Sequence, residues 1–389
     1  MTNRPTMLIL SFSPIARDAR VLKQVERFRY EFDVTTCGYG DAPEGVAEHI
    51  RVPDDARYND LNGSLITLKR YRAAYWRLSA VKWARENLRG RRFDVAIADD
   101  VEAVPVAVKL HPRNGVLADL HEYSPRLHDD HALWFKRITP WFEWVVRRYV
   151  TKADAWTTVS RGIVEEYRRN FGFRAELVTN AAPHRADLAP SPVGDPIRLV
   201  HSGACLRDRN LHLMAEAVEE AANDVTLDFY LTPNHPDYLD ELKAFAATSS
   251  RITVHEPVPY ARLIDTLNSY DVGIFVLPPV NFNYAHALPN KLFDFVQARL
   301  AVLIGPSSEM EHYVRTYGLG EVADANTKDA ARAAVERLTQ ESVAAAKAHS
   351  HAAAAELSGE NQVDVWERLI MSLMVRDRRR RRDAGGAGE

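Results

Sequence analysis

The chain has 389 residues, of which 46% are apolar and 26% charged, and its formal net charge is −3. This is the composition of an ordinary globular protein, and the length exceeds what a single hydrophobic core usually supports, so two domains are expected. Two cysteines cannot form a disulfide framework, and no apolar run reaches the ~18 residues of a membrane-spanning helix. These observations exclude the disulfide-framework, membrane-spanning and wholly disordered classes. The first apolar stretch is too short for a signal peptide, so a cytoplasmic protein is expected.

Short apolar runs alternate with helical patterns along the chain, which predicts βαβ units and parallel sheets. The runs are nearly continuous in apolar character, as in strands that are buried on both faces. In the first half the expected strands are 7–12, 32–37, 93–98, 115–120, 154–159 and 175–179. The helical patterns between them are Asp18–Tyr30, Leu65–Leu88 and Arg137–Thr151. In the second half the expected strands are 197–203, 225–231, 252–257, 271–277 and 300–305.

A proline-rich segment separates the two halves, because four prolines occur between positions 183 and 196 with little apolar patterning. We therefore expect two doubly wound α/β domains facing a cleft, with ligands beyond the carboxyl ends of the strands. The expected divisions are a first domain at 1–185, a linker at 186–196, a second domain at 197–358, a C-terminal helix at 359–376 and a disordered Arg-rich tail at 377–389.

Charge is divided unevenly between the two halves. Residues 1–190 carry 30 basic and 25 acidic side chains, a net charge of +5, whereas residues 191–389 carry 20 and 28, a net charge of −8. The segment 134–148 mixes aromatic and basic residues, and contact with an anionic membrane is one explanation. An amphipathic core helix with basic outer positions explains it better. The Arg-rich end has no aromatic residue for stacking on bases, so no nucleic acid is expected as a partner.

The motifs of several other enzyme classes are absent from the sequence. No G-x-G-x-x-G follows a strand, and there is no P-loop, no G-x-S-x-G elbow and no zinc-binding spacing. The adjacent acids Asp99 and Asp100 end a strand and could hold a divalent ion. A solvated loop or a helix cap is the preferred interpretation of such a pair, so the sequence requires no metal.

The strongest chemical signal lies in Ala285–Gly305, where Pro289 and Asn290 predict the start of a helix. Lys291 is in the first turn, where the helix N–H groups and a full positive charge would together favour a phosphate. Asp294 follows one turn later and could accept hydrogen bonds from ribose hydroxyls. A capped helix with a surface Lys-x-x-Asp pair is the alternative explanation.

A second cluster follows the strand 197–203, where Gly203 leads into a loop that contains Arg207 and Arg209. Arginine stays charged and can hold a pyrophosphate through paired hydrogen bonds. A surface loop with solvated arginines is the alternative for so short a motif.

In the first half, His121 and Glu122 follow the strand 115–120 and are expected at the same edge as the turn that contains Ser13. Histidine is the usual proton-transfer residue and a good partner for sugar hydroxyls. A lone histidine is more often structural, but its position at the end of a strand favours a functional role.

Taken in order, these motifs resemble the retaining glycosyltransferases of the GT-B fold, family 4 type. The set covers most of the chain, and although each motif alone is weak, the ordered set is fairly specific. It consists of Asp18-x-Arg20-Val21, Asp119-x-His121-Glu122, Thr158-Val159-Ser160, Val178-Thr179-Asn180, Gly203 with Arg209-Asn210, Tyr270-Asp271-Val272 and Pro289-Asn290-Lys291-Leu292-Phe293-Asp294. The resemblance implies two Rossmann-like domains facing a cleft and a C-terminal helix that returns toward the N-terminal domain.

The resemblance also implies that the second domain binds a nucleotide-diphosphate sugar and the first binds the acceptor. The residues it implies as catalytic are His121, Arg209 and Lys291, with the two cations on the diphosphate and the histidine near the transferred sugar. The implied donor-binding residues are Gly203, Arg207, His286, Pro289, Asn290 and Asp294. The implied acceptor-side residues are Ser13, Arg20 and Glu122.

The sequence departs from the family's pattern at several positions. The family often carries two glutamates eight positions apart, where this chain has His286 and Asp294. A serine-containing turn, 11–13, replaces the glycine pair of the first loop. Ala204 stands where an arginine is common, which leaves Arg207 as a substitute.

The expected activity is transfer of a sugar from a nucleotide-diphosphate sugar to a hydroxyl acceptor that is a glycan, a lipid-linked sugar or a natural product. By resemblance it is retaining and needs neither cofactor nor metal, and the donor nucleotide is UDP, GDP or dTDP. Two other functions stay open: a sugar-nucleotide 2-epimerase of the same fold, and a non-catalytic nucleotide-sugar-binding module. Peripheral contact with the inner face of an anionic membrane also stays open.

Overall fold

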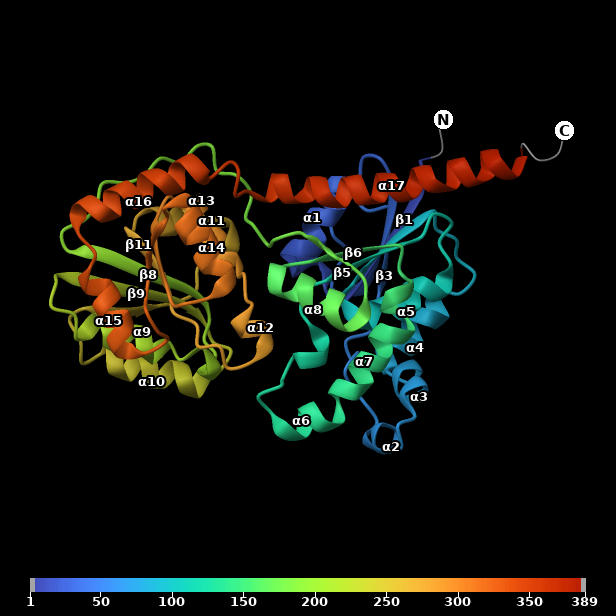
Figure 1. The fold of residues 1–389 in the computed structure, drawn as a ribbon, viewed down its shortest axis with the longest axis horizontal. Helices are drawn as coiled ribbons and strands as arrows, with labels where there is room; N and C mark the ends of the chain where they lie inside the picture. The colour runs from blue at the N-terminus through green and yellow to red at the C-terminus, as the bar shows by residue number, and fades with distance from the viewer. Residues whose placement is uncertain (1–3, 386–389) are drawn as a thin grey trace. The chain divides into compact units, whose positions relative to one another are not determined.

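The computed structural model describes residues 4–385, with side chains through Val375. The chain forms two compact units, each of which is described separately below (Figure 1). Unit 1 comprises the chain up to Val178 and again from Gln362 onward, and unit 2 comprises Thr179–Asn361. The first boundary therefore falls a few residues before the proline-rich segment.

Unit 1 is built on a seven-stranded sheet in which all neighbouring strands pair in parallel, in the order β3-β2-β1-β4-β5-β6-β7. Six of these strands match the apolar runs of the sequence. The seventh, β3, is an edge strand of four residues with a single fully buried side chain, which explains why hydrophobicity did not reveal it. The strands are β1 (Thr6–Pro14), β2 (Asp33–Tyr39), β3 (Glu48–Arg51), β4 (Val95–Asp99), β5 (Val116–Leu120), β6 (Ala155–Thr158) and β7 (Glu176–Leu177).

The helical pattern expected at 65–88 is divided into three short helices. Asn62 caps the first by accepting a hydrogen bond from the backbone N–H of Leu65 at 3.0 Å, and Lys69 just after it has a φ of 53°, in the left-handed region that ends a helix. The helices of unit 1 before the linker are α1 (Ala19–Phe28), α2 (Gly63–Thr67), α3 (Tyr71–Trp76), α4 (Ser79–Asn87), α5 (Asp100–Leu110), α6 (Ala132–Arg137), α7 (Thr139–Arg148) and α8 (Arg161–Phe171).

Helix α7 carries most of the aromatic and basic segment noted in the sequence. Trp141, Phe142, Val145 and Val146 are buried on one face, whereas the basic residues at its end are exposed. The apolar face of α7 is therefore part of the core of unit 1, whereas Phe135, Lys136 and Arg137 at the start of the segment are exposed.

The last helix, α17 (Gly359–Gly385), packs against unit 1, as the family resemblance implies (Figure 1). Trp366, Ile370 and Leu373 are buried in the same core as side chains of β1 and α1. The structure continues this helix through 377–385, where the sequence predicts a disordered tail, and residues 386–389 lie outside the described part. Among the described helices, none combines the length and the hydropathy that crossing a bilayer requires.

Unit 2 repeats the architecture with a six-stranded parallel sheet in the order β10-β9-β8-β11-β12-β13. Five strands match the predicted runs, and the sixth is a three-residue edge strand with no fully buried residue. The strands are β8 (Ile197–Ala204), β9 (Val225–Thr232), β10 (Ile252–His255), β11 (Val272–Phe275), β12 (Ala301–Ile304) and β13 (Gly320–Val322).

Helices cover both faces of this sheet (Figure 1). One apolar cluster joins the sheet to α9, α10 and α15, and a second joins its other face to α11, α13 and α14. The order of the strands reverses direction at β8 and β11, and in such sheets ligands bind at the carboxyl ends of the strands at that point. The helices are α9 (Leu211–Glu219), α10 (Pro236–Ala246), α11 (Tyr260–Asn268), α12 (Phe282–Ala285), α13 (Asn290–Gln297), α14 (Ser308–Tyr317), α15 (Lys328–Glu336) and α16 (Gln340–Ala353).

Candidate functional site

In unit 2, three of the predicted residues come together at the carboxyl end of β8. Gly203 has a φ of +128°, and a Cβ atom built on it would lie 2.4 Å from Nζ of Lys291 and 3.9 Å from Nη1 of Arg209. Glycine is therefore needed there for two reasons: its backbone conformation and the close approach of the lysine. Arg209 also donates from Nη1 to the carbonyl oxygen of Ala204 at 3.4 Å. We refer to Gly203, Arg209 and Lys291 as the cation cluster.

The two positive charges of the cation cluster disfavour each other. Burial and then the charge of Arg209 lower the pKa of Lys291 to about 7, with partial compensation from Asp294. The ammonium group lies over the ring of Phe275, 5.1 Å from its centroid. Two cations held this closely at the first turn of α13 form a binding site suited to an anion.

His201 lies beneath the cation cluster and is fully buried. Its Nδ1 donates to the carbonyl oxygen of Ile274 at 2.9 Å, and burial together with Lys291 and Arg209 holds its pKa well below the ordinary value. The ring is therefore neutral and adds no third positive charge. No sequence signal marks this residue, because a histidine within an apolar strand has the pattern of a core residue.

The remaining donor-side residues lie on α13 and next to it. Pro289 is the N-cap of α13, and Asn290 is its first residue and is exposed. Asp294 is buried one turn later, with 4% of its surface exposed. His286 lies 3.9 Å from the Oε1 of Glu309 on α14, measured from its Nδ1. Glu309 is itself buried, so α14 places a carboxylate beside His286.

Arg207 is directed toward a different part of unit 2. Its guanidinium forms ion pairs with Glu241 at 2.8 Å and Asp237 at 3.1 Å, and it stacks on the ring of Tyr238. These partners belong to α10. In this structure Arg207 is thus engaged by carboxylates and does not extend the cation cluster, against its expected use as a substitute for the family's arginine.

In unit 1, His121 is surrounded by three aspartates at the ends of β4 and β5. Its Nε2 lies 3.4 Å from Asp99 and 3.7 Å from Asp119, and its Nδ1 lies 3.4 Å from Asp100. Its backbone N–H also donates to Asp100 at 2.9 Å. Although burial alone would lower it, these carboxylates raise the pKa of His121 well above the ordinary value. The imidazole is therefore held as a cation with both nitrogens directed at carboxylates.

Asp119 anchors a buried network behind this histidine. Arg20 donates to both of its oxygens, at 2.7 and 2.6 Å, and Gln24 donates to Asp119 and Asp99 at 2.8 Å each. Arg20 also contacts the Val178 carbonyl oxygen. Its side chain is 5% exposed, so Arg20, which the sequence analysis assigns to the acceptor side, holds this network in place.

Three groups of this network have the donor set of a metal site, since ligand atoms of Asp99, Asp119 and His121 lie within 4.8 Å of one another. Their chemistry does not favour a divalent ion. The guanidinium of Arg20 already occupies both oxygens of Asp119, and a metal would be placed next to that charge. Burial also raises the pKa of Asp99 above its ordinary value, which disfavours the ionised form that a metal ligand needs.

The other acceptor-side residues are near the surface of unit 1. Ser13 lies at the end of β1 and shares a hydrogen bond of 2.8 Å with Ser11. The Glu122 side chain is exposed, and its backbone carbonyl accepts a hydrogen bond from Tyr167 at 2.9 Å. Ser13 is thus in the last part of β1, and Glu122 follows the carboxyl end of β5.

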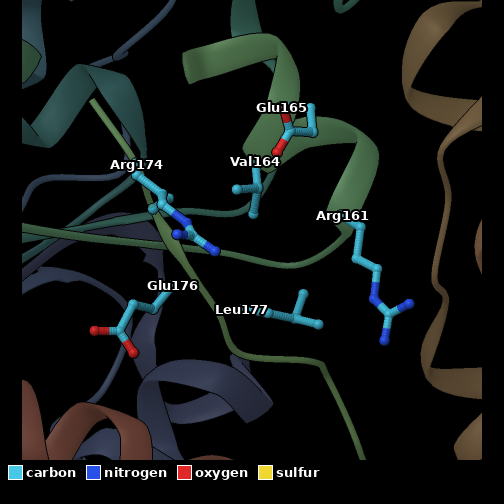
Figure 2. Close-up of a pocket in the computed structure, with 7 residues that line it drawn as sticks. Arg161, Val164, Glu165, Arg174, Glu176 and Leu177 are labelled. Carbon is cyan, nitrogen blue, oxygen red and sulfur yellow. The ribbon is translucent and has the colours of Figure 1, made fainter. Parts of the chain in front are cut away.

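A separate hollow of about 760 Å³ lies between α8 and the segment that contains β7 (Figure 2). Arg174 extends into it, Arg161 lies at one end, and Glu165 and Glu176 also line it. None of the residues predicted from the sequence as catalytic, donor-binding or acceptor-side lines this hollow. The candidate chemistry therefore lies with the cation cluster and with the network around His121.

No protein-family model and no curated protein matches this sequence. Solved structures do match it across nearly its whole length. Anabaena HepE in complex with UDP-glucose superposes with a TM-score of 0.69 at 11% identity, covering 95% of this chain and 100% of HepE. The UDP-forming α,α-trehalose-phosphate synthase of Burkholderia xenovorans, in complex with glucose-6-phosphate, has a TM-score of 0.67 at 12% identity, covering 94% and 99%.

A glycosyltransferase from Rickettsia africae also has a TM-score of 0.67 at 12% identity, covering 96% of this chain and 99% of its own. Identities this low establish the fold alone. The fold is the GT-B fold of these glycosyltransferases, with one parallel α/β sheet in each unit.

Proposed function

We propose that the protein is a glycosyltransferase that moves a sugar from a nucleotide-diphosphate sugar to a hydroxyl acceptor. The observation that carries this proposal is the cation cluster, where Lys291 and Arg209 are held together at the carboxyl end of β8. Holding two cations together in a partly buried position costs free energy, and a bound diphosphate would offset that cost. The GT-B fold and the motif order support the same conclusion.

In this proposal unit 2 binds the donor. Arg209, Lys291 and the backbone N–H groups of the first turn of α13 stabilise the negative charge that builds on the diphosphate as the anomeric C–O bond breaks. Asp294 accepts hydrogen bonds from the ribose. Partial desolvation and the charge of Asp294 raise the pKa of Tyr260, which lies near that carboxylate and is half exposed. Tyr260 is thus available to contact the nucleobase.

Unit 1 provides the acceptor-side residues. His121, kept charged by the aspartates around it, lies near the transferred sugar, and Ser13 and Glu122 are the candidates for acceptor contact. We propose retention of configuration by front-face attack, in which the leaving phosphate takes the acceptor's proton, as the resemblance to family 4 implies. We also propose that transfer needs no metal, because placed cations supply the charge stabilisation.

The nucleotide is the first point to test. HepE is solved in complex with UDP and with UDP-glucose, so UDP is the leading choice over GDP and dTDP. Thermal unfolding in the presence of each nucleotide and its sugars would identify the donor. A rise in midpoint with one base and none with the others is expected, and no rise with any of them would contradict donor binding.

Arg209→Ala tests the role of the cation cluster. Removing one preorganised charge from a developing anion costs about 3–4 kcal/mol, so turnover of the donor should fall at least about 100-fold. The control is Arg315→Ala, an exposed arginine of α14 paired with Glu311. Both variants should unfold at the same urea concentration as the original protein. Unchanged turnover in Arg209→Ala would contradict the assignment.

A sugar-nucleotide 2-epimerase and a non-catalytic binding module remain the alternatives. The epimerase would convert the donor to its 2-epimer with no acceptor present, which nuclear magnetic resonance of the sugar would detect. A binding module would bind the donor without slow hydrolysis. The carboxylate of Glu309 beside His286 is a candidate acid for an epimerase. Glu309→Gln is therefore the variant that distinguishes an epimerase from a glycosyltransferase.

A further inference from the structure

Unit 1 has a surface that the proposed function does not use. Two neighbouring hollows, of about 550 and 590 Å³, share Arg72, Trp76 and Arg85 in their walls. They lie on α3, α4 and the ends of α2 and α5, and α7 contributes Trp144. We call them together the basic groove. Its cations are Lys69, Arg70, Arg72, Arg77, Arg85, Arg89, Arg91, Arg92 and Lys109.

The charge of the basic groove is largely unbalanced. Neither hollow is lined by an aspartate or a glutamate within the described part of the chain. Arg91 pairs with Glu48, and the other eight cations form no ion pair within the described residues. All nine side chains are exposed. This many positive side chains on one face favour binding of a partner that carries many negative charges.

Trp76 forms part of the floor of the basic groove. Its Nε1 donates to the Tyr149 hydroxyl at 3.1 Å, its ring packs edge-on against Tyr75, and Arg85 lies 5.7 Å from the ring centroid. These contacts hold the ring in place within the protein. It is therefore poorly suited as a platform on which a nucleic acid base would stack.

An exposed apolar corner adjoins the basic groove. Leu68, directly before Lys69, is 68% exposed, and Leu133 and Phe135 on α6 are 57% and 45% exposed. Arg137 at the end of α6 donates to the Thr67 hydroxyl at 2.8 Å, which ties α6 to α2. Large apolar side chains next to a basic surface serve no purpose toward a soluble anion, but they can enter the boundary between headgroups and acyl chains.

We propose that the basic groove and the apolar corner together form a docking surface for an anionic lipid bilayer. The cations would contact the headgroup phosphates, and Leu68 and Phe135 would insert at the boundary. This surface includes Phe135 and Trp144 of the aromatic and basic segment 134–148, but not the apolar face of α7, which is buried in the core. The inference stands apart from the proposed sugar transfer, and it can be tested without donor or acceptor.

Sedimentation of the full chain with vesicles tests the proposal. The protein should bind vesicles of phosphatidylcholine mixed with phosphatidylglycerol, bind phosphatidylcholine alone weakly, and be released by salt. Each cation near an anionic surface contributes about a fivefold change in partition, so the double variant Arg72→Glu, Arg85→Glu should bind at least about 25-fold more weakly. Leu68→Ser combined with Phe135→Ser should weaken the binding that persists at high salt.

The matched control is Arg168→Glu with Arg174→Glu, which makes the same change of charge on and next to α8, outside the basic groove. It should bind within about twofold of the original protein. Urea unfolding of each variant identifies any that fails to fold, in which case Arg70→Ala with Arg77→Ala replaces it. Equal loss in groove and control variants, or equal binding to both vesicle types, would overturn the proposal. Binding of a DNA duplex through the same groove without vesicle binding would also overturn it.

Discussion

Lys291 shows how far a residue's chemistry depends on its surroundings. As an exposed lysine it would carry its charge through the whole neutral range. Burial and the neighbouring Arg209 lower its pKa to about 7, so near neutral pH the group is divided between its charged and neutral forms. A bound diphosphate would favour the charged form. The free energy of donor binding should therefore depend on pH through this residue.

The affinity for UDP should accordingly fall as pH rises from about 7 to about 9, by up to tenfold per unit, because binding must then restore the proton on Lys291. The second ionisation of the UDP phosphate, near pH 6, is complete in this range and does not account for the loss. Isothermal titration calorimetry in two buffers of different ionisation enthalpy would measure the proton uptake.

The matched variant is Lys291→Arg, because a guanidinium stays charged at every pH in this range. Its affinity for UDP should be nearly constant between about pH 7 and pH 9. The same pH dependence in both proteins would show that another group titrates.

His121 illustrates the opposite shift. Three carboxylates keep it charged, and Asp119 in turn depends on Arg20 and Gln24, which come from α1. Arg20 thus acts through Asp119 and not on a ligand. The sequence places His121 at the end of a strand, but it does not show that an arginine about a hundred positions earlier fixes the carboxylate behind it.

At the scale of elements, the sequence predicts buried strands well and exposed ones poorly. The central strands of both sheets are continuous apolar runs because both of their faces are covered. The edge strands β3 and β13 are short and mostly exposed, and hydrogen bonding to a neighbour defines them more than hydrophobicity does. The break of 65–88 into three helices likewise depends on the backbone at Lys69.

The contribution of α17 to unit 1 can be measured with Trp366→Ala. Trp366 is 1% exposed, packs among side chains of β1 and α1, and lies under the guanidinium of Arg20 at 4.9 Å. Truncation should lower the free energy of unfolding of unit 1 by about 3–5 kcal/mol. Urea unfolding followed by circular dichroism would measure it.

Met371→Ala provides the comparison on the same helix, because Met371 is 40% exposed. Its effect should be within about 0.5 kcal/mol. Similar small effects of the two substitutions would show that α17 does not contribute to the core.

At the scale of the whole molecule, charge and chemistry are divided between two units of one architecture. The half of the chain with net positive charge contains the basic groove and the His121 network, and the acidic half contains the cation cluster. In this acidic half of the chain, Arg209 and Lys291 are the cations positioned to bind a diphosphate.

This division predicts where UDP changes the protein. Hydrogen–deuterium exchange should show protection at 203–210 and 289–294 on addition of UDP, while the peptides of the basic groove exchange as before. Ordering of the loop after β8 and of the first turn of α13 by the diphosphate is the physical reason. Arg209→Ala should remove this protection. Protection confined to unit 1 would contradict the assignment of the donor to unit 2.

The sequence by itself determined the class of fold, the two-part organisation and the positions of His121, Gly203, Arg209 and Lys291 after strands or at the start of a helix. These follow from local patterns, since apolar runs and turn residues are read within a few positions. The tertiary structure decided which of the candidate residues are free to act. Arg207 forms ion pairs with α10, and Arg20 is buried and hydrogen-bonded to Asp119. Glu309, on a later helix, lies beside His286. Such pairings join residues far apart in the chain, and only packing brings them within reach of one another.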